Sequence, residues 1–121
     1  MQNFGNFSPV VLEEIQQKGY HILNKSLPKG SYPNEFPKFH TLNEIKIGET
    51  FVLRLFVKIP NNILQNIDSG LIDVKIVKKI KNGYKAEILT LLPDFFPLSK
   101  GKIIEIKKEE ILYQQSGGEY Y

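Results

Sequence analysis

The fold is decided by one stretch of sequence, Thr50-Phe51-Val52-Leu53-Arg54-Leu55-Phe56-Val57-Lys58-Ile59, in which apolar and polar side chains alternate. Every odd position from 51 to 59 is apolar, whereas the even positions include Thr50, Arg54 and Lys58. A period of two is typical of a β-strand that is buried on one face. We therefore predict a strand over 50–59 whose odd-numbered side chains form the core of a sheet.

A second alternating segment, 71–80, predicts the next strand, and Asn82-Gly83 after it predicts a hairpin turn. A two-residue turn at Asn82-Gly83 would break the apolar face of this hairpin. A three-residue loop, 81–83, keeps that face intact because it places Ile80 opposite Tyr84. We therefore predict the three-residue loop, with Gly83 at a positive φ.

A short helix is predicted over residues 9–18. Ser8 is a favourable N-cap, Pro9 suits the first helical position, and Gly19 can end the helix. Its apolar stripe consists of Val11, Leu12 and Ile15.

The remaining segments are less regular. Prolines, glycine and aromatic residues in 24–41 predict an irregular segment that wraps around the same core. Pro93 and Pro97 interrupt the sheet, 102–107 reads as a short strand, and 109–113 as a last strand or one helical turn. The end of the chain, 114–121, shows no period and is predicted to be a flexible tail.

These elements predict one domain over residues 1–121, with its β-rich core in 43–113. A length of 121 residues suits a single domain. Short strands that are joined by tight loops, with one leading helix, indicate a mainly β member of the α+β class. We expect a small, strongly bent antiparallel sheet or a partly open barrel of SH3-like or OB-like type, with one short N-terminal helix.

The composition excludes several classes of protein. The chain contains no cysteine, which excludes disulfides and thiolate metal sites. No apolar run approaches the ~20 residues that span a bilayer. The first residues, Met1 to Asn6, carry no signal-peptide pattern. We therefore expect a cytoplasmic protein that does not bind a membrane.

No catalytic or metal-binding pattern stands out. His21 and His40 are the two histidines, and a zinc site would need further ligands. The sequence has neither a glycine-rich phosphate loop nor a nucleophile elbow. We predict that the protein is not an enzyme and uses no cofactor or metal. We also predict that no polar cleft gathers either histidine with two or more carboxylates.

The leading functional hypothesis is a small interaction domain that binds a protein partner or a second copy of itself. Phe56 points away from the odd-numbered core, so the helix, the Tyr32–Phe39 segment or a second chain must cover it. We favour a cover from this chain, and exposure would instead mark an interface. Phe95 and Phe96 lie between two prolines and either plug the barrel end or face a partner. The candidate partner-binding residues are Val52, Arg54, Phe56, Phe95 and Phe96.

Small accessory proteins of bacteria and phages are of this size and type, an analogy that rests on size and fold.

The alternative hypothesis is a sequence-tolerant nucleic-acid binder that uses the hairpin 75–85. Residues 71–92 hold five lysines against two carboxylates, so this stretch accounts for the formal net charge of +3 of the whole chain. Lysines beside an aromatic residue suit binding to a phosphate backbone. Lysines at the edge of a sheet also prevent that edge from pairing with another chain, which is the alternative explanation. The residues concerned are Lys75, Lys78, Lys79, Lys81, Tyr84 and Lys85.

Overall fold

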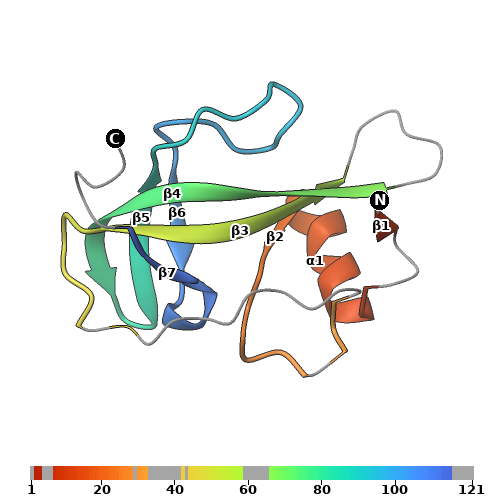
Figure 1. Ribbon diagram of the computed structural model, residues 1–121, viewed down its shortest axis with the longest axis horizontal. Helices are drawn as coiled ribbons and strands as arrows, with labels where there is room; N and C mark the ends of the chain where they lie inside the picture. The colour runs from red at the N-terminus through yellow and green to blue at the C-terminus, as the bar shows by residue number, and fades with distance from the viewer. Residues whose placement is uncertain are drawn as a thin grey trace.

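The computed structural model describes residues 2–3, 7–28, 30–32, 42, 44–58 and 66–115. In chain order, its elements are β1 (Gln2–Asn3), α1 (Pro9–Lys18), β2 (Tyr20–Ile22), β3 (Thr50–Lys58), β4 (Asn66–Ile80), β5 (Gly83–Ile88), β6 (Ile103–Ile106), the 3₁₀ helix η2 (Lys108–Glu110) and β7 (Tyr113–Gln115) (Figure 1). The mainly β fold with one short helix confirms the predicted fold class.

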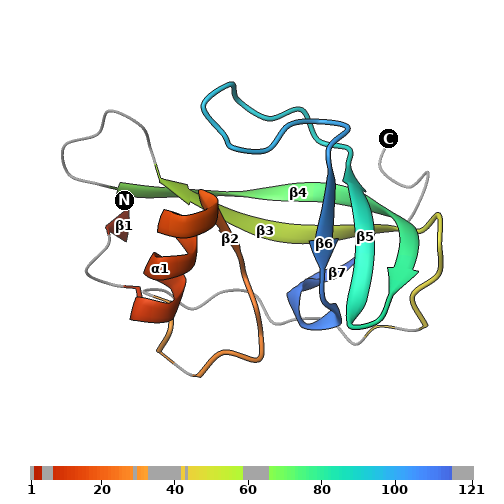
Figure 2. The same ribbon diagram turned by 180° about the vertical axis from the view of Figure 1, so that it is seen from behind.

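The strands form one curled antiparallel sheet in the order β2-β3-β4-β5-β6 (Figure 2). β4 pairs along one edge of β3. The other edge of β3 pairs with β7 near the start of β3 and with β2 near the end of β3. The chain runs from β6 through η2 to β7, so the sheet bends back onto β3. This meander fits the SH3-like alternative better than the Greek-key order of an OB-fold.

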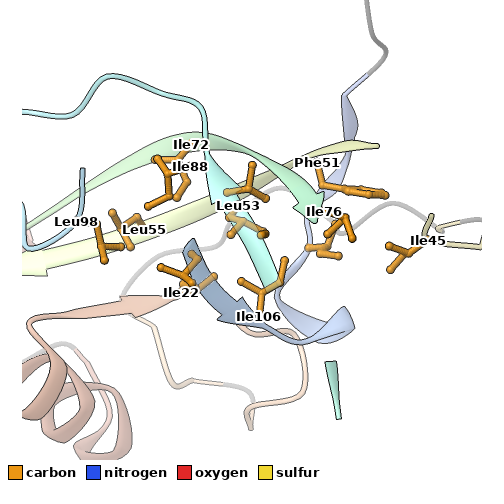
Figure 3. Packing of buried hydrophobic residues seen from close by; sticks show 14 of the residues in the cluster. Ile22, Ile45, Phe51, Leu53, Leu55, Ile72, Ile76, Ile88, Leu98 and Ile106 are labelled. Carbon is orange, nitrogen blue, oxygen red and sulfur yellow. The ribbon is translucent and has the colours of Figure 1, made fainter. Parts of the chain in front are cut away.

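β3 is buried on both faces. Its odd-numbered residues Phe51, Leu53, Leu55 and Val57 lie in the barrel core, as the alternation predicts, and Ile59 lies outside the described residues. The other strands contribute a matching apolar face, which includes Ile72, Ile76, Ile88 and Ile106 (Figure 3). On the opposite face, Val52 and Phe56 form a second cluster with Phe7, Val11, Ile15, Leu23, Ile67 and Leu112. The favoured expectation, that this chain itself covers Phe56, is therefore confirmed.

The helix has the predicted bounds because its ends are set by local chemistry. The Ser8 hydroxyl accepts a hydrogen bond from the Val11 N–H at 3.4 Å. Gly19 adopts φ 90° and donates its N–H to the carbonyl of Ile15 at 2.8 Å. Val11 and Ile15 are buried against β3, so one face of α1 closes the second cluster.

The hairpin between β4 and β5 differs from the prediction. Ile80 pairs with Gly83 across a two-residue turn at Lys81-Asn82, and Tyr84 pairs with Lys79. The predicted three-residue loop is wrong, and Gly83 does not have a positive φ. A bulge between Ile76 and Lys78 adds one residue to β4, which returns Ile76 to the apolar face despite the shifted turn.

The structure also extends some predicted elements. β4 begins at Asn66, before the predicted start at 71, and β2 was not predicted. Gln114 and Gln115, which the sequence assigned to a flexible tail, pair with Phe51 and Thr50 in β7. In the irregular segment 24–41, residues 24–28 and 30–32 form turns and bends, and residues 29 and 33–41 lie outside the described residues. The last part of the predicted tail, 116–121, also lies outside the described residues.

Gly83 is required by the close approach of β6. A Cβ at this position would overlap the carbonyl oxygen of Ile106, whereas a Cβ at Gly70 would meet no atom within 4 Å. We expect Gly83→Ala to lower the free energy of unfolding by ~1–3 kcal/mol. Gly70→Ala should leave it unchanged or raise it by ~0.4–1 kcal/mol. Urea denaturation of both variants provides the comparison, and equal stability would show that β6 moves aside without cost.

Candidate functional site

A cleft of about 500 Å³ lies between the helical side of the molecule and β6. Its first wall contains Val10, Glu14 and Lys18 of α1 with His21, Asn24 and Leu27. Its second wall contains Ile80, Asn82, Glu105, Ile106, Lys107 and Glu110. β2 and β6 are the terminal strands of the sheet order (Figure 2). The cleft is lined by His21 of β2 and by Glu105 and Ile106 of β6, so it lies between the two ends of the sheet.

This cleft corrects one expectation from the sequence. Three carboxylates, Glu14, Glu105 and Glu110, line it together with His21, so the predicted absence of such a cleft is wrong. His40 lies outside the described residues. The sequence could not reveal this arrangement, because the second wall comes from residues far along the chain that line the same cleft as His21 only after the sheet has curled.

His21 is held from both sides of its ring. Its Nδ1 lies 2.7 Å from Oε1 of Glu14, and its Nε2 lies 2.6 Å from the hydroxyl of Tyr32. The Tyr32 oxygen also accepts the N–H of Asn24 at 3.0 Å. The other carboxylate oxygen of Glu14 lies 3.5 Å from Nζ of Lys18. These contacts connect α1, β2 and the bend at Tyr32.

The protonation states of His21 and Tyr32 follow from their burial and their hydrogen-bond partners. Burial lowers the pKa of His21 from its ordinary value of 6.5, against the opposing effect of the Glu14 carboxylate. Burial raises the pKa of Tyr32 to about 12, so its hydroxyl keeps its proton. Since a carboxylate can only accept, we assign the proton of neutral His21 to Nδ1, which donates to Glu14. Nε2 then accepts from Tyr32.

Both ring nitrogens of His21 are therefore engaged within the protein. A general acid or base needs a nitrogen within reach of the substrate, and the present hydrogen bonds occupy both. Among the described residues, no three His, Asp or Glu side chains are grouped so that they could hold a metal ion. This arrangement favours a role for His21 in fixing the Tyr32 ring, which stacks on Phe56 at 5.5 Å.

The second wall of the cleft carries two carboxylates, Glu105 and Glu110. Glu110 accepts the N–H of Lys107 through Oε1 at 2.8 Å, and burial raises the pKa of its carboxyl group. Glu105 is exposed on β6. Within the described part of the chain, neither carboxylate forms an ion pair with a lysine, arginine or histidine.

The structure separates the predicted partner-binding residues. Val52 and Phe56 are buried inside the second cluster and present no surface, while Arg54 donates to the hydroxyl of Ser69 at 3.3 Å. Phe96 packs on the barrel core. Phe95 is 43% exposed in the loop between β5 and β6. Leu91 in the same loop is 82% exposed, and no pattern in the sequence had singled it out.

The basic hairpin presents lysines but no free aromatic face. Lys75, Lys78, Lys79 and Lys81 are exposed, and Lys85 is half-buried. Tyr84 is partly buried against the barrel core, which leaves little of its ring for stacking on a base. Lys75 faces Glu87 across the strands, whereas Lys78 faces Lys85.

Comparisons of the chain with protein-family models, curated proteins and solved structures find no match. None of the helices in the described ranges has the length and apolar character needed to cross a membrane.

The His21 network predicts a pH dependence of stability. Because the pKa of His21 is lowered in the folded protein, the unfolded chain binds a proton first as the pH falls below about 6.5. The free energy of unfolding should therefore decrease on acidification below this pH, by at most ~1.4 kcal/mol per pH unit from this group. Denaturation of the native protein and His21→Gln between about pH 7.5 and 5.5, roughly one unit on either side of the ordinary histidine pKa, measures the difference in slope.

Glu110 titrates in the opposite sense, since its raised pKa favours the folded state at low pH. This contribution is common to both proteins and cancels in the comparison. Parallel slopes would contradict a neutral His21 in the folded state.

Proposed function

We propose that the chain is a small non-enzymatic interaction domain that binds a protein partner or a second copy of itself through the loop 89–101. The observation that carries this proposal is the exposure of two large apolar side chains, Leu91 and Phe95, in that loop. Exposed apolar side chains that gather in one patch are typical of interaction surfaces. Val52 and Phe56, which the sequence suggested, take no part because they are buried.

The loop is fixed to the sheet, so it presents these side chains in a defined conformation. Leu89 donates its N–H to the carbonyl of Asp73 at 2.8 Å, and the Asp73 N–H donates to the Thr90 hydroxyl at 2.8 Å. At the other end, Gly101 donates to the carbonyl of Ile88 at 2.7 Å. Leu98 is buried in the core. A loop that is already ordered loses less conformational entropy on binding.

The neighbouring strands add apolar area on the outer face of the sheet. Leu71 of β4 is 47% exposed and Ile103 of β6 is 46% exposed. Each adjoins a buried residue in its strand, Ile72 and Ile104, so both side chains point away from the barrel core.

The double substitution Leu91→Ser with Phe95→Ser tests this surface. Leu91 is exposed, and the Phe95 ring packs on Phe96 with ring centroids 4.9 Å apart, so we expect the free energy of unfolding to fall by ~1 kcal/mol and the fold to be kept. Binding of the partner or self-association should be lost. Affinity capture and sedimentation analysis of the native protein and the double variant measure these two outcomes.

Ile47→Ser is the matched control, because Ile47 is 61% exposed but lies in the turn before β3. It should behave like the native protein. If the native protein and the double variant retain the same proteins and have the same oligomeric state, the loop is not the interaction surface.

A second candidate function, binding to single-stranded nucleic acid, is favoured by the cross-strand pair Lys78 and Lys85. Like charges directly opposite each other repel, and a phosphate between them would relieve that repulsion. Titration of a labelled oligonucleotide across a salt series tests this function. Lys78→Gln with Lys85→Gln should reduce the slope of log K against log salt by about 1.4, the value for two phosphate contacts on a single strand.

Lys100→Gln is the control, because Lys100 is exposed outside the hairpin and should leave the slope unchanged. No binding of the native protein at low salt would exclude this function.

A further inference from the structure

One edge of the sheet carries backbone groups that no other strand of the described residues uses. β6 is the last strand in the sheet order, and within the described residues it pairs with β5. The Ile88 N–H donates to the carbonyl of Lys102 at 2.9 Å. Hydrogen-bonded pairs alternate along an antiparallel ladder, so Ile104 bonds to β5 and the N–H and C=O groups of Ile103 and Glu105 point away from β5.

This edge borders the cleft described above. Glu105, Ile106 and Lys107 form part of the second wall, and α1 with His21 forms the first. A volume of about 500 Å³ lies within the usual range for ligand pockets. Of the two residues whose backbone groups point away from β5, Glu105 lines the cleft, so an extended chain that follows this edge of β6 would enter the cleft at Glu105.

The charges along the cleft indicate the kind of side chain that fits. Glu14 is already bound to Lys18 and His21. Glu105 and Glu110 form no ion pair among the described residues, and Glu110 is held in a partly desolvated position where its pKa is raised. A cation that approached these two carboxylates would offset the cost of burying the charge on Glu110.

We infer that the cleft binds an extended peptide segment that pairs with the outer edge of β6 and directs a lysine or arginine side chain toward Glu105 and Glu110. Main-chain hydrogen bonds to a strand edge supply affinity in this mode of recognition, and side-chain contacts supply specificity. The site goes beyond the proposed function, because it uses none of the exposed apolar side chains in the loop 89–101. The partner is defined by its chemistry as a basic segment in β conformation.

A capped peptide of sequence Thr-Val-Thr-Lys-Thr-Val-Thr is the probe. Titration into the isotope-labelled protein should shift the backbone amide signals of Ile103 and Glu105 in a saturable manner. A peptide with glutamate in place of lysine should bind about tenfold more weakly, the effect of one well-placed charge contact. N-methylation of the peptide backbone should abolish binding, because it removes the donors that pair with the edge.

Variants of the cleft provide the second arm of the test. Glu105→Gln and Glu110→Gln should each weaken binding of the lysine peptide about three- to fivefold, as expected for a partly exposed ion pair. Glutamine at position 110 keeps an oxygen that can accept the Lys107 N–H, so the turn at η2 is preserved. Glu87→Gln is the matched control, because Glu87 lies on β5 and does not line the cleft.

Three results would overturn the inference. They are the absence of a saturable shift at Glu105, equal affinity for the lysine and glutamate peptides, and equal affinity for the lysine peptide and n-butylamine. The last result would show that the cleft binds an amine without strand pairing. The loop variant Leu91→Ser with Phe95→Ser should bind the peptide normally, so failure of the loop proposal and failure of this one are distinguishable.

Discussion

The structure depends on the burial of apolar side chains on both faces of β3. β4 pairs with one edge of this strand, and β2 and β7 share the other. Its odd-numbered side chains fill the barrel core, and Val52 and Phe56 on the other face pack against the helix. Phe56 is fully buried, with the Phe7 ring edge-on at 5.5 Å and the Tyr32 ring stacked at 5.5 Å. Removing this strand from water therefore requires both the curled sheet and the N-terminal segment.

The cleft is a consequence of how Phe56 is covered. Docking of α1 through Val11 and Ile15 places Glu14 and Lys18 at the opening of the barrel. The same docking brings Glu14 to His21, and His21 in turn holds the Tyr32 ring over Phe56. The polar network and the apolar cluster thus support each other. The loop 89–101 lies outside both, so Leu91 and Phe95 remain in water.

Local chemistry made much of the fold predictable from the sequence. Ser8, Pro9 and Gly19 define both ends of the helix, because capping acts over three or four residues. Alternation along β3 identified its core face, and the apolar Phe56 on the other face already required a cover. Among the candidate functional residues, the lysines of the hairpin and the exposed Phe95 could be named from the sequence, although the residues that surround them could not.

Tertiary structure decided the features that depend on contacts between distant segments. The turn at Lys81-Asn82 was settled by a bulge in β4 and by the approach of Ile106 to Gly83, neither of which local alternation encodes. The adjacent Phe95 and Phe96 have the same local pattern, yet the curl of the sheet buries more of one and exposes the other. His21 and Glu110 line the same cleft only because the sheet curls. Local sequence patterns were enough to place the helix α1 and the long strand β3, whereas β2 and β7 form through pairing with β3. The closure of the sheet settles which side chains share a site, because it brings together residues that are far apart in the sequence.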